Sequence, residues 1–102
     1  MRAQQVQFAL LRKLWAAGIE ADGEAQLPAR SPLSRAKTFK ADVLVYGLGR
    51  RPIAAIECKG YSGPPNGQRQ RENYEMCGIP AVWCGPDDIN NVVRRMVQYA
   101  TP

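Results

Sequence analysis

Two segments decide the predicted fold: Lys40-Ala41-Asp42-Val43-Leu44-Val45-Tyr46 and Ile53-Ala54-Ala55-Ile56-Glu57-Cys58-Lys59. Both are short apolar runs with β-branched residues, which is typical of strands that face a core. The residues between them, 47–52, contain two glycines and a proline and predict a turn. The sequence therefore predicts a β-hairpin in which each strand carries an acidic residue.

The turn sets the register of this hairpin. Glycine is preferred at the first central position of a two-residue type II′ turn, so we place Gly49-Arg50 at the tip. In that register Asp42 faces Glu57, and period-two alternation puts Lys59 on the face of Glu57 with Ile56 on the other. A slip of one residue would send Asp42 to the opposite face. Because directly opposite like charges destabilise a sheet, the pair indicates a binding site.

Composition limits the classes of function. A chain of 102 residues predicts one domain, residues 1–102, with a modest core. A net charge of +5 favours a polyanionic partner, and we expect nucleic acid. The chain contains no histidine, which excludes histidine zinc sites, histidine-dependent triads and imidazole acid–base catalysis.

The cysteines and the apolar segments predict where the protein resides. Cys58, Cys77 and Cys84 show no C-x-x-C spacing, and an odd number of thiols indicates a reducing compartment. No stretch approaches the ~20 apolar residues that span a bilayer, and the N-terminal residues lack a signal-peptide pattern. We expect a cytoplasmic protein with no membrane partner.

The rest of the pattern predicts an α/β protein. Expected elements besides the hairpin are a helix over 4–17, a weak strand over 19–29 with a turn at Asp22-Gly23, a loop over 30–40, a loop over 60–67, a helix over 68–77, a strand over 79–84 and a helix from Gly85 onward. This order gives an αβββαβ(α) sandwich around a mixed sheet of about four strands. The aromatic residues Trp15, Trp83 and Tyr99 are expected in the core, with a subunit interface as the alternative.

The residues of the hairpin suit one kind of chemistry. Asp42 and Glu57 supply the carboxylates that hard divalent cations prefer, and the backbone carbonyl of Cys58 is a natural third oxygen. Lys59 is placed to contact a scissile phosphate and stabilise developing charge. Without histidine, metal-activated water is the expected nucleophile. The structural alternative makes Asp42 a turn cap and the other two residues exposed strand ends.

The spacing of these residues resembles a known nuclease pattern. Asp42, followed after fourteen residues by Glu57-Cys58-Lys59 at the end of an apolar strand, resembles the PD-(D/E)XK nuclease superfamily. Together with the stretches 69–70, 74–75, 77–82 and 86–88, the chain looks like a stand-alone VRR-NUC (virus-type replication-repair nuclease) domain. The resemblance implies a restriction-endonuclease-like fold and Mg²⁺- or Mn²⁺-dependent hydrolysis of DNA by an endonuclease of phage or prophage replication or repair, in a bacterial or phage-infected cell.

The resemblance also implies roles for single residues. Asp42 and Glu57 would be metal ligands, and Lys59 would be the catalytic lysine. Gln70 matches a catalytic-site glutamine that such domains often place on the helix after the motif, with Gln68 as its rival. Small stand-alone relatives are homodimers, so a homodimer is implied as well.

One feature of the family pattern is missing. Many relatives carry an acidic metal ligand on the first helix, where this chain has only Gln4, Gln5 and Gln7. A glutamine carbonyl, or Glu20 or Glu24, would have to complete the site. The alternative function is a non-catalytic DNA-binding or assembly module on the same fold, and a third is a subunit active only inside a larger complex.

Basic residues flank the motif in sequence and are expected to contact DNA phosphates. They are Arg35, Lys37, Lys40, Arg69 and Arg71. The hairpin tip, residues 49–51, is expected either to enter a groove or to be a solvated turn. No base-reading motif is apparent, which favours selection of branched or junction DNA over sequence-specific cleavage.

Overall fold

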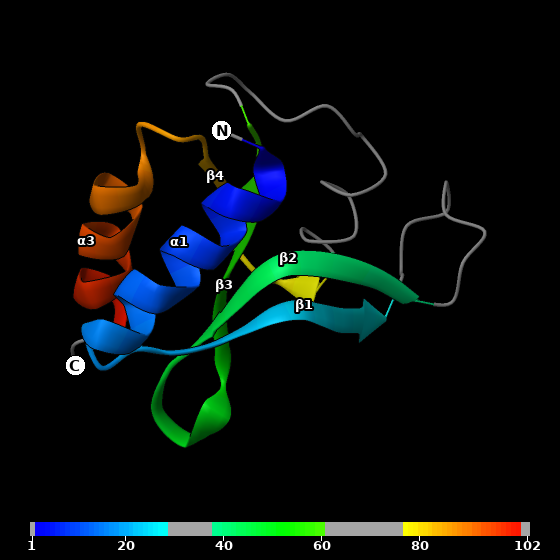
Figure 1. Cartoon of the computed structure of the whole chain (residues 1–102). Helices are drawn as coiled ribbons and strands as arrows, with labels where there is room; N and C mark the ends of the chain where they lie inside the picture. Colours follow the sequence, from blue (N-terminus) through cyan, green and yellow to red (C-terminus); the bar gives the residue numbers. More distant parts are fainter. Residues whose placement is uncertain (1, 29–37, 61–76, 101–102) are drawn as a thin grey trace.

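The computed structural model describes residues 2–28, 38–60 and 77–100, and Figure 1 draws the others as a thin grey trace. The described elements are α1 (Ala3–Ala16), β1 (Glu20–Pro28), β2 (Thr38–Tyr46), the 3₁₀ turn η1 (Leu48–Arg50), β3 (Pro52–Cys58), β4 (Ala81–Cys84) and α3 (Ile89–Ala100). They form an α/β protein, as expected. The helix expected over 68–77 lies outside the described residues except for its last residue, Cys77, which is helical.

The four strands form one mixed sheet in the order β1-β2-β3-β4. Both β1–β2 and β2–β3 pair antiparallel, whereas β3 and β4 run parallel. Helices α1 and α3 contact each other and lie against one face of this sheet (Figure 1). The prediction of a mixed sheet of about four strands is therefore confirmed.

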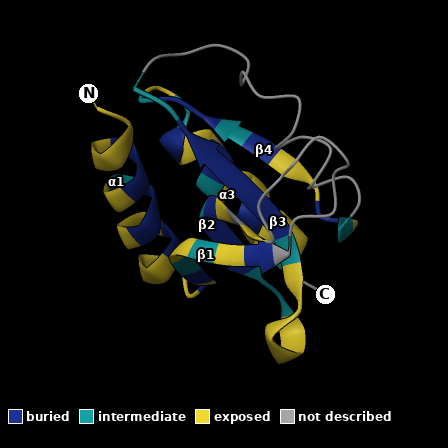
Figure 2. Ribbon diagram, turned by 90° about the vertical axis from the view of Figure 1, so that its right-hand side faces the viewer, coloured by how far each residue is buried: buried dark blue, intermediate teal, exposed yellow. Residues whose placement is uncertain are grey.

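The main core lies between the two helices and the sheet. Leu10 and Leu14 of α1 and Met96 of α3 are fully buried there against Val43 and Ile56 of the central strands. A smaller cluster packs on the opposite face. Its buried members are Leu27, Ala41, Leu44, Ala55 and Ile79. Figure 2 shows the same division, with the sheet-facing side of α1 buried and its outer side exposed.

Helix α1 begins and ends within one residue of its predicted bounds. The side chain of Gln5 accepts a hydrogen bond from the backbone N–H of Arg2 at 2.8 Å, which satisfies one of the free donors of the first turn. After the helix, Gly18 has a φ of +77°, the left-handed conformation that commonly ends helices. The expectation that Trp15 and Tyr99 lie in the core is wrong, because 56% and 47% of their surfaces are exposed.

Strand β1 lies within the range expected for the weak strand, residues 19–29. The turn expected at Asp22-Gly23 is wrong, because Gly23 pairs with Val43 inside a strand of nine residues. A Cβ atom on Gly23 would lie 2.9 Å from Cδ1 of Leu11 and 3.2 Å from Nε2 of Gln7. Glycine at this position therefore lets the Leu11 and Gln7 side chains of α1 lie close to the backbone of β1.

The β2–β3 hairpin adopts the predicted register over its central part. Val43 pairs with Ile56, and the next two residues of β2 continue in step. The register then shifts between Val45 and Tyr46, so that Tyr46 pairs with Pro52. This bulge absorbs one extra residue of β3 close to the turn.

The turn stands where the sequence places it but has another geometry. Gly49 and Arg50 have φ values of +67° and +57°, and Arg51 N–H donates to the Leu48 carbonyl at 3.4 Å. Positive φ at both central residues is typical of a type I′ turn, so the type II′ prediction is wrong. Arginine rarely adopts this conformation.

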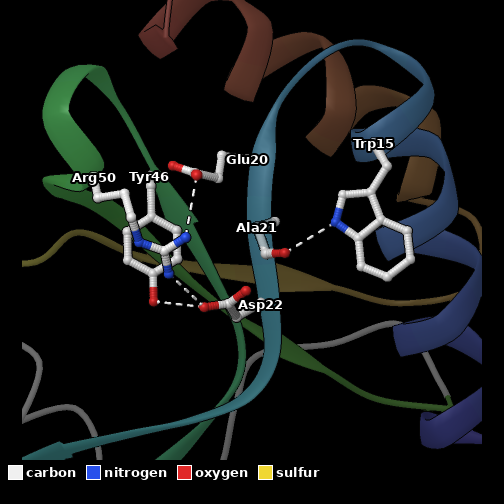
Figure 3. Close-up of polar contacts among 6 residues, drawn as sticks. All are labelled: Trp15, Glu20, Ala21, Asp22, Tyr46 and Arg50. Carbon is white, nitrogen blue, oxygen red and sulfur yellow. Dashed lines mark hydrogen bonds and ion pairs between the residues drawn. The ribbon is translucent and has the colours of Figure 1, made fainter.

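The side chain of Arg50 holds the turn against β1 (Figure 3). Its Nη1 lies 3.1 Å from Glu20 Oε1, its Nη2 lies 2.9 Å from Asp22 Oδ2, and its guanidinium covers the Tyr46 ring at 4.4 Å. The Tyr46 hydroxyl donates to Asp22 at 3.0 Å. Burial and this hydrogen bond to a carboxylate raise the pKa of Tyr46. Arg50 therefore contacts β1 while residues 48–51 are exposed to solvent, as expected for a solvated turn.

Helix α3 starts later than predicted. Residues 86–88 form a turn in which the Gly85 N–H donates to the Asp88 carboxylate at 2.9 Å, and the helix begins only at Ile89. Ile89, Val92 and Met96 face the core as their spacing predicts. None of the helices in the described ranges is long and apolar enough to cross a membrane.

Candidate functional site

Asp42 and Glu57 lie next to each other on neighbouring strands. Because Val43 pairs with Ile56, the two acids follow at adjacent positions of β2 and β3. Oδ2 of Asp42 accepts a hydrogen bond from the backbone N–H of Cys58 at 2.8 Å. The Asp42 carboxylate therefore lies beside the peptide bond that joins Glu57 to Cys58.

Along β2 and β1, the side of the sheet on which the apolar residues pack changes near Asp42. Residues two apart on a strand normally share a face. Yet Val43 packs under α1, whereas Ala41 packs in the cluster on the opposite side. On β1 the same change separates Ala21 from Ala25, around Glu24 with its φ of +54°. Alternation from Leu44 places Asp42 on the face to which Ala55 and Glu57 belong.

Glu57 is nearly inaccessible to solvent. Only 6% of its surface is exposed, and it stands in register with Trp83 of β4. An ionised carboxylate loses much of its hydration when it is buried, which is costly unless other groups stabilise it. Buried ionisable groups with a nearby like charge are typical of functional sites. The exposed strand end of the structural alternative does not describe this residue.

Lys59 follows the last residue of β3 and is fixed through its main chain. Its backbone N–H donates to the carbonyl of Cys84 at 3.0 Å, which extends the contact between β3 and β4 by one residue. The residue is partly exposed. The lysine is therefore anchored two residues from Glu57 while remaining accessible to a partner in solution.

The pKa of the Cys58 thiol depends on its burial and on the charged residues around it. Burial raises its pKa most, the neighbouring Cys84, Asp42 and Glu57 raise it further, and Lys59 lowers it. The three charged residues of the predicted site therefore all lie close enough to act on one sulfur atom. Since its side chain packs in the core as a neutral thiol, Cys58 can offer a cation only its backbone carbonyl.

These buried thiols predict how stability depends on pH. Burial and the nearby Asp88 carboxylate raise the pKa of Cys84 to about 12, and Cys58 is also raised, from an ordinary value of 9.0. Above pH 9 the unfolded chain loses these protons and the folded chain keeps them. The free energy of unfolding should therefore be unaffected by the thiols below pH 9 and fall between pH 9 and 12.

Urea unfolding of the wild-type chain and of Cys84→Ala at pH 8 to 11 measures this effect. The variant starts from a lower stability but should lose less of it as the pH rises. Cys77→Ala is the matched control, because Cys77 lies outside the main core. Equal slopes for the wild type and Cys84→Ala would show that the Cys84 thiol does not drive the alkaline loss.

The first helix brings one glutamine to the site region. Gln4 and Gln5 are exposed, and Gln5 caps the start of α1. Gln7 is buried, and its amide nitrogen lies against Gly23, whose neighbourhood also includes the backbone carbonyl of Asp42. Of the glutamines named from the sequence, Gln7 is therefore the one that faces the sheet near Asp42. A burial pattern that repeats every three to four residues places Gln7 beside Val6 and could have singled it out.

The two glutamates of β1 differ in their relation to the site. Glu20 binds Arg50 at the hairpin tip and does not complete the site. Glu24 stands level with Asp42, between the pairs that Gly23 and Ala25 form with β2, and is exposed. Within residues 2–28, 38–60 and 77–100, no three Asp, Glu, Cys or His side chains gather into a metal-binding group. The described donor set is two carboxylates and a carbonyl.

Of the remaining predicted site residues, the structure describes only Lys40. Gln70, Arg35, Lys37, Arg69 and Arg71 lie outside the described residues. Lys40 is described: it is exposed on β2, two residues before Asp42, and its backbone pairs with Gln26 of β1. A cation therefore stands on the strand that carries Asp42, and its contact with DNA phosphates stays a prediction.

Comparisons of the chain with known proteins add no relative. No protein-family model matches it, and neither curated proteins nor solved structures give a significant match. Function is therefore inferred from the residues of the site itself.

Proposed function

We propose that the chain is a metal-dependent DNA endonuclease that hydrolyses phosphodiester bonds and selects branched or junction DNA. The observation that carries this proposal is the position of the Asp42 carboxylate, 2.8 Å from the backbone nitrogen that follows Glu57. The anchored Lys59 comes next along the chain. The described order of helix, three strands, strand and helix is compatible with a restriction-endonuclease-like fold of the VRR-NUC type.

The donor set fits Mg²⁺ or Mn²⁺. Asp42, Glu57 and the Cys58 carbonyl would hold the ion, because hard cations take one or two carboxylates and complete their shell with water and phosphate oxygens. The hydrogen bond from Cys58 uses one of about four lone-pair positions on the Asp42 carboxylate and leaves the others available. When bound, the ion would polarise a phosphoryl oxygen and lower the pKa of a water.

The protein side chains supply position and charge. Lys59 donates to the scissile phosphate and stabilises negative charge that develops on it. The bond between Asp42 and the Cys58 amide keeps the end of β3 close to β2, so that the carboxylates do not separate. Burial of Glu57 strengthens its attraction to cations, because the local dielectric is lower than that of water.

A second candidate function is a non-catalytic DNA-binding module. The described site has only two carboxylates, and Asp42 already has a structural partner in the Cys58 amide. Such a module would bind DNA in a salt-sensitive manner through the net charge of +5, without metal-dependent turnover.

Cleavage assays separate these two functions. The purified chain is incubated with linear, flapped and four-way DNA, with and without Mn²⁺. Cleavage that requires Mn²⁺ and favours the branched substrates supports the endonuclease. Salt-sensitive binding with no cleavage of any substrate at any Mn²⁺ concentration overturns it and leaves the binding module.

A further inference from the structure

The outer side of the helix layer carries charges of one sign. The charged residues within α1 and α3 are Arg12, Lys13, Arg94 and Arg95, and all four are exposed. None of the nine Asp and Glu residues of the chain lies in either helix. The nearest acids in sequence, at 87 and 88, precede α3. The two helices therefore present a cationic surface without internal neutralisation.

Exposed apolar residues gather on the same two helices. Within the described residues, the exposed large hydrophobic residues are Phe8, Trp15, Val97 and Tyr99 on these helices, and Leu48 at the hairpin tip. Trp15 and Tyr99 expose 56% and 47% of their surfaces. Both helices therefore combine exposed aromatic rings with cations that no acid of the same helix neutralises.

Both aromatic rings are held in place. The indole N–H of Trp15 donates to the carbonyl of Ala21 at 2.9 Å, as Figure 3 shows, and the rest of the ring remains accessible. Arg95 donates to the Tyr99 hydroxyl at 3.2 Å, with its guanidinium 5.9 Å from the ring centroid. Rings that are already ordered lose little conformational freedom when a ligand stacks on them.

The two helices contact each other. Their side chains meet where Lys13 Nζ donates to Asn90 Oδ1 at 2.5 Å. On α1, Arg12 and Trp15 are three residues apart and lie on the same side of the helix. We define the helix-layer surface by six residues. They are Arg12, Lys13, Trp15, Arg94, Arg95 and Tyr99.

The helix-layer surface is separate from the candidate nuclease site. Ile56 and Cys58 of β3 pack under the helices, so Glu57 between them belongs to the opposite face of the sheet. A ligand on the helices therefore does not touch Glu57.

We propose that the helix-layer surface binds single-stranded nucleic acid. A positively charged path with exposed aromatic rings suits a single strand, because its phosphates contact the cations and its unpaired bases stack on the rings. Every base has an aromatic face, so this binding is tolerant of sequence. A duplex offers its phosphates but keeps its bases stacked inside, and it gains nothing from Trp15 and Tyr99.

Two other partners fit the same surface less well. A two-fold dimer through this surface would bring the four cations of one copy against those of the other, which is unfavourable. Tryptophans at membrane interfaces direct their N–H toward the wet headgroups. The Trp15 N–H instead points to Ala21 within the protein.

The test measures binding of oligo-dT and of a matched duplex to the full chain in EDTA, where cleavage cannot occur. The wild type should prefer oligo-dT. The variant Arg12→Gln/Lys13→Gln/Arg94→Gln/Arg95→Gln should bind at least tenfold more weakly. Its salt dependence should fall by up to about 0.7 per phosphate contact removed. Trp15→Ala should lower affinity about tenfold without changing the salt dependence, as expected for one lost base stack.

The control is Arg51→Gln, an exposed cation at the hairpin tip, which should leave oligo-dT affinity within twofold. The proposal is overturned if the variant with all four substitutions binds oligo-dT like the wild type while retaining its fold by circular dichroism. It is also overturned if the wild type binds only anionic vesicles, or if the variant changes only the oligomeric state. Metal binding by the variant with all four substitutions should be unchanged. The outcome of this test is therefore independent of the proposed nuclease activity.

Discussion

Lys59→Ala is expected to lower Mn²⁺-dependent DNA cleavage by about 10²–10³-fold while leaving DNA affinity within a few-fold. The reason is that one ammonium group among many cations contributes little to binding, whereas it contributes directly to the charge on the reacting phosphate. The main chain of Lys59 is fixed by Cys84 through its N–H, which alanine retains. The substitution therefore removes the charge without disturbing the end of β3.

Single-turnover cleavage and fluorescence anisotropy on the same DNA separate the two quantities. Arg51→Ala is the matched control, since Arg51 is an exposed cation at the other end of the hairpin and should leave the rate within twofold. If Lys59→Ala keeps more than a tenth of the activity, Lys59 is not a catalytic residue. If affinity and rate fall equally, its role is DNA binding.

Leu10→Ala is expected to lower the free energy of unfolding by about 2–5 kcal/mol. Leu10 has no exposed surface and lies in the core between α1 and the sheet. Truncation would lose the burial of its side chain and leave a cavity, because neighbouring residues in a close-packed core relax only partly.

Leu48→Ala provides the same chemical change at an exposed position. Leu48 is 99% exposed at the hairpin tip, so its truncation should change stability by less than about 0.5 kcal/mol. Urea unfolding of both variants gives the comparison. Equal effects of the two substitutions would mean that α1 does not pack on the sheet as described.

The hairpin was predictable because several local signals agree. β-branched residues, a glycine and proline turn, and acids at matching distances from it all point to one pairing, and Val43 pairs with Ile56 as predicted. The turn type was not predictable. Its geometry depends on Arg50, whose left-handed backbone is supported by contacts to Glu20 and Asp22 on another strand.

The roles of residues that depend on contacts between distant elements could not be predicted from the sequence. Gly23 resembles a turn residue, but its small size serves the approach of Leu11 from α1. Trp15 has helical spacing that suits the core, yet it lies at the edge of the area that α1 covers. Neither contact exists until the helix has packed on β1, so no local pattern contains it.

The candidate site likewise has features that the sequence predicted and features that it could not predict. The sequence predicted that Asp42 and Glu57 come together, and the structure places them on adjacent strands. It could not predict that Asp42 accepts the Cys58 N–H, because this bond joins a side chain of β2 to the backbone of β3 and leaves no local sequence signal. The helical spacing of Gln7 with Val6 and Leu10 could have ranked it above the exposed Gln4 and Gln5, but its position beside Gly23 could not be predicted.

The most direct test of the proposed metal site is calorimetric titration of Mn²⁺ into the metal-free chain, its Asp42→Asn and Glu57→Gln variants, and Glu20→Gln. Glu20 is an acid of the same sheet that binds Arg50 and serves as the control. We expect saturable binding to the wild type and to Glu20→Gln, and at least tenfold weaker binding to the other two. Equal binding by all four proteins, or no binding by the wild type, would contradict a metal site between Asp42 and Glu57.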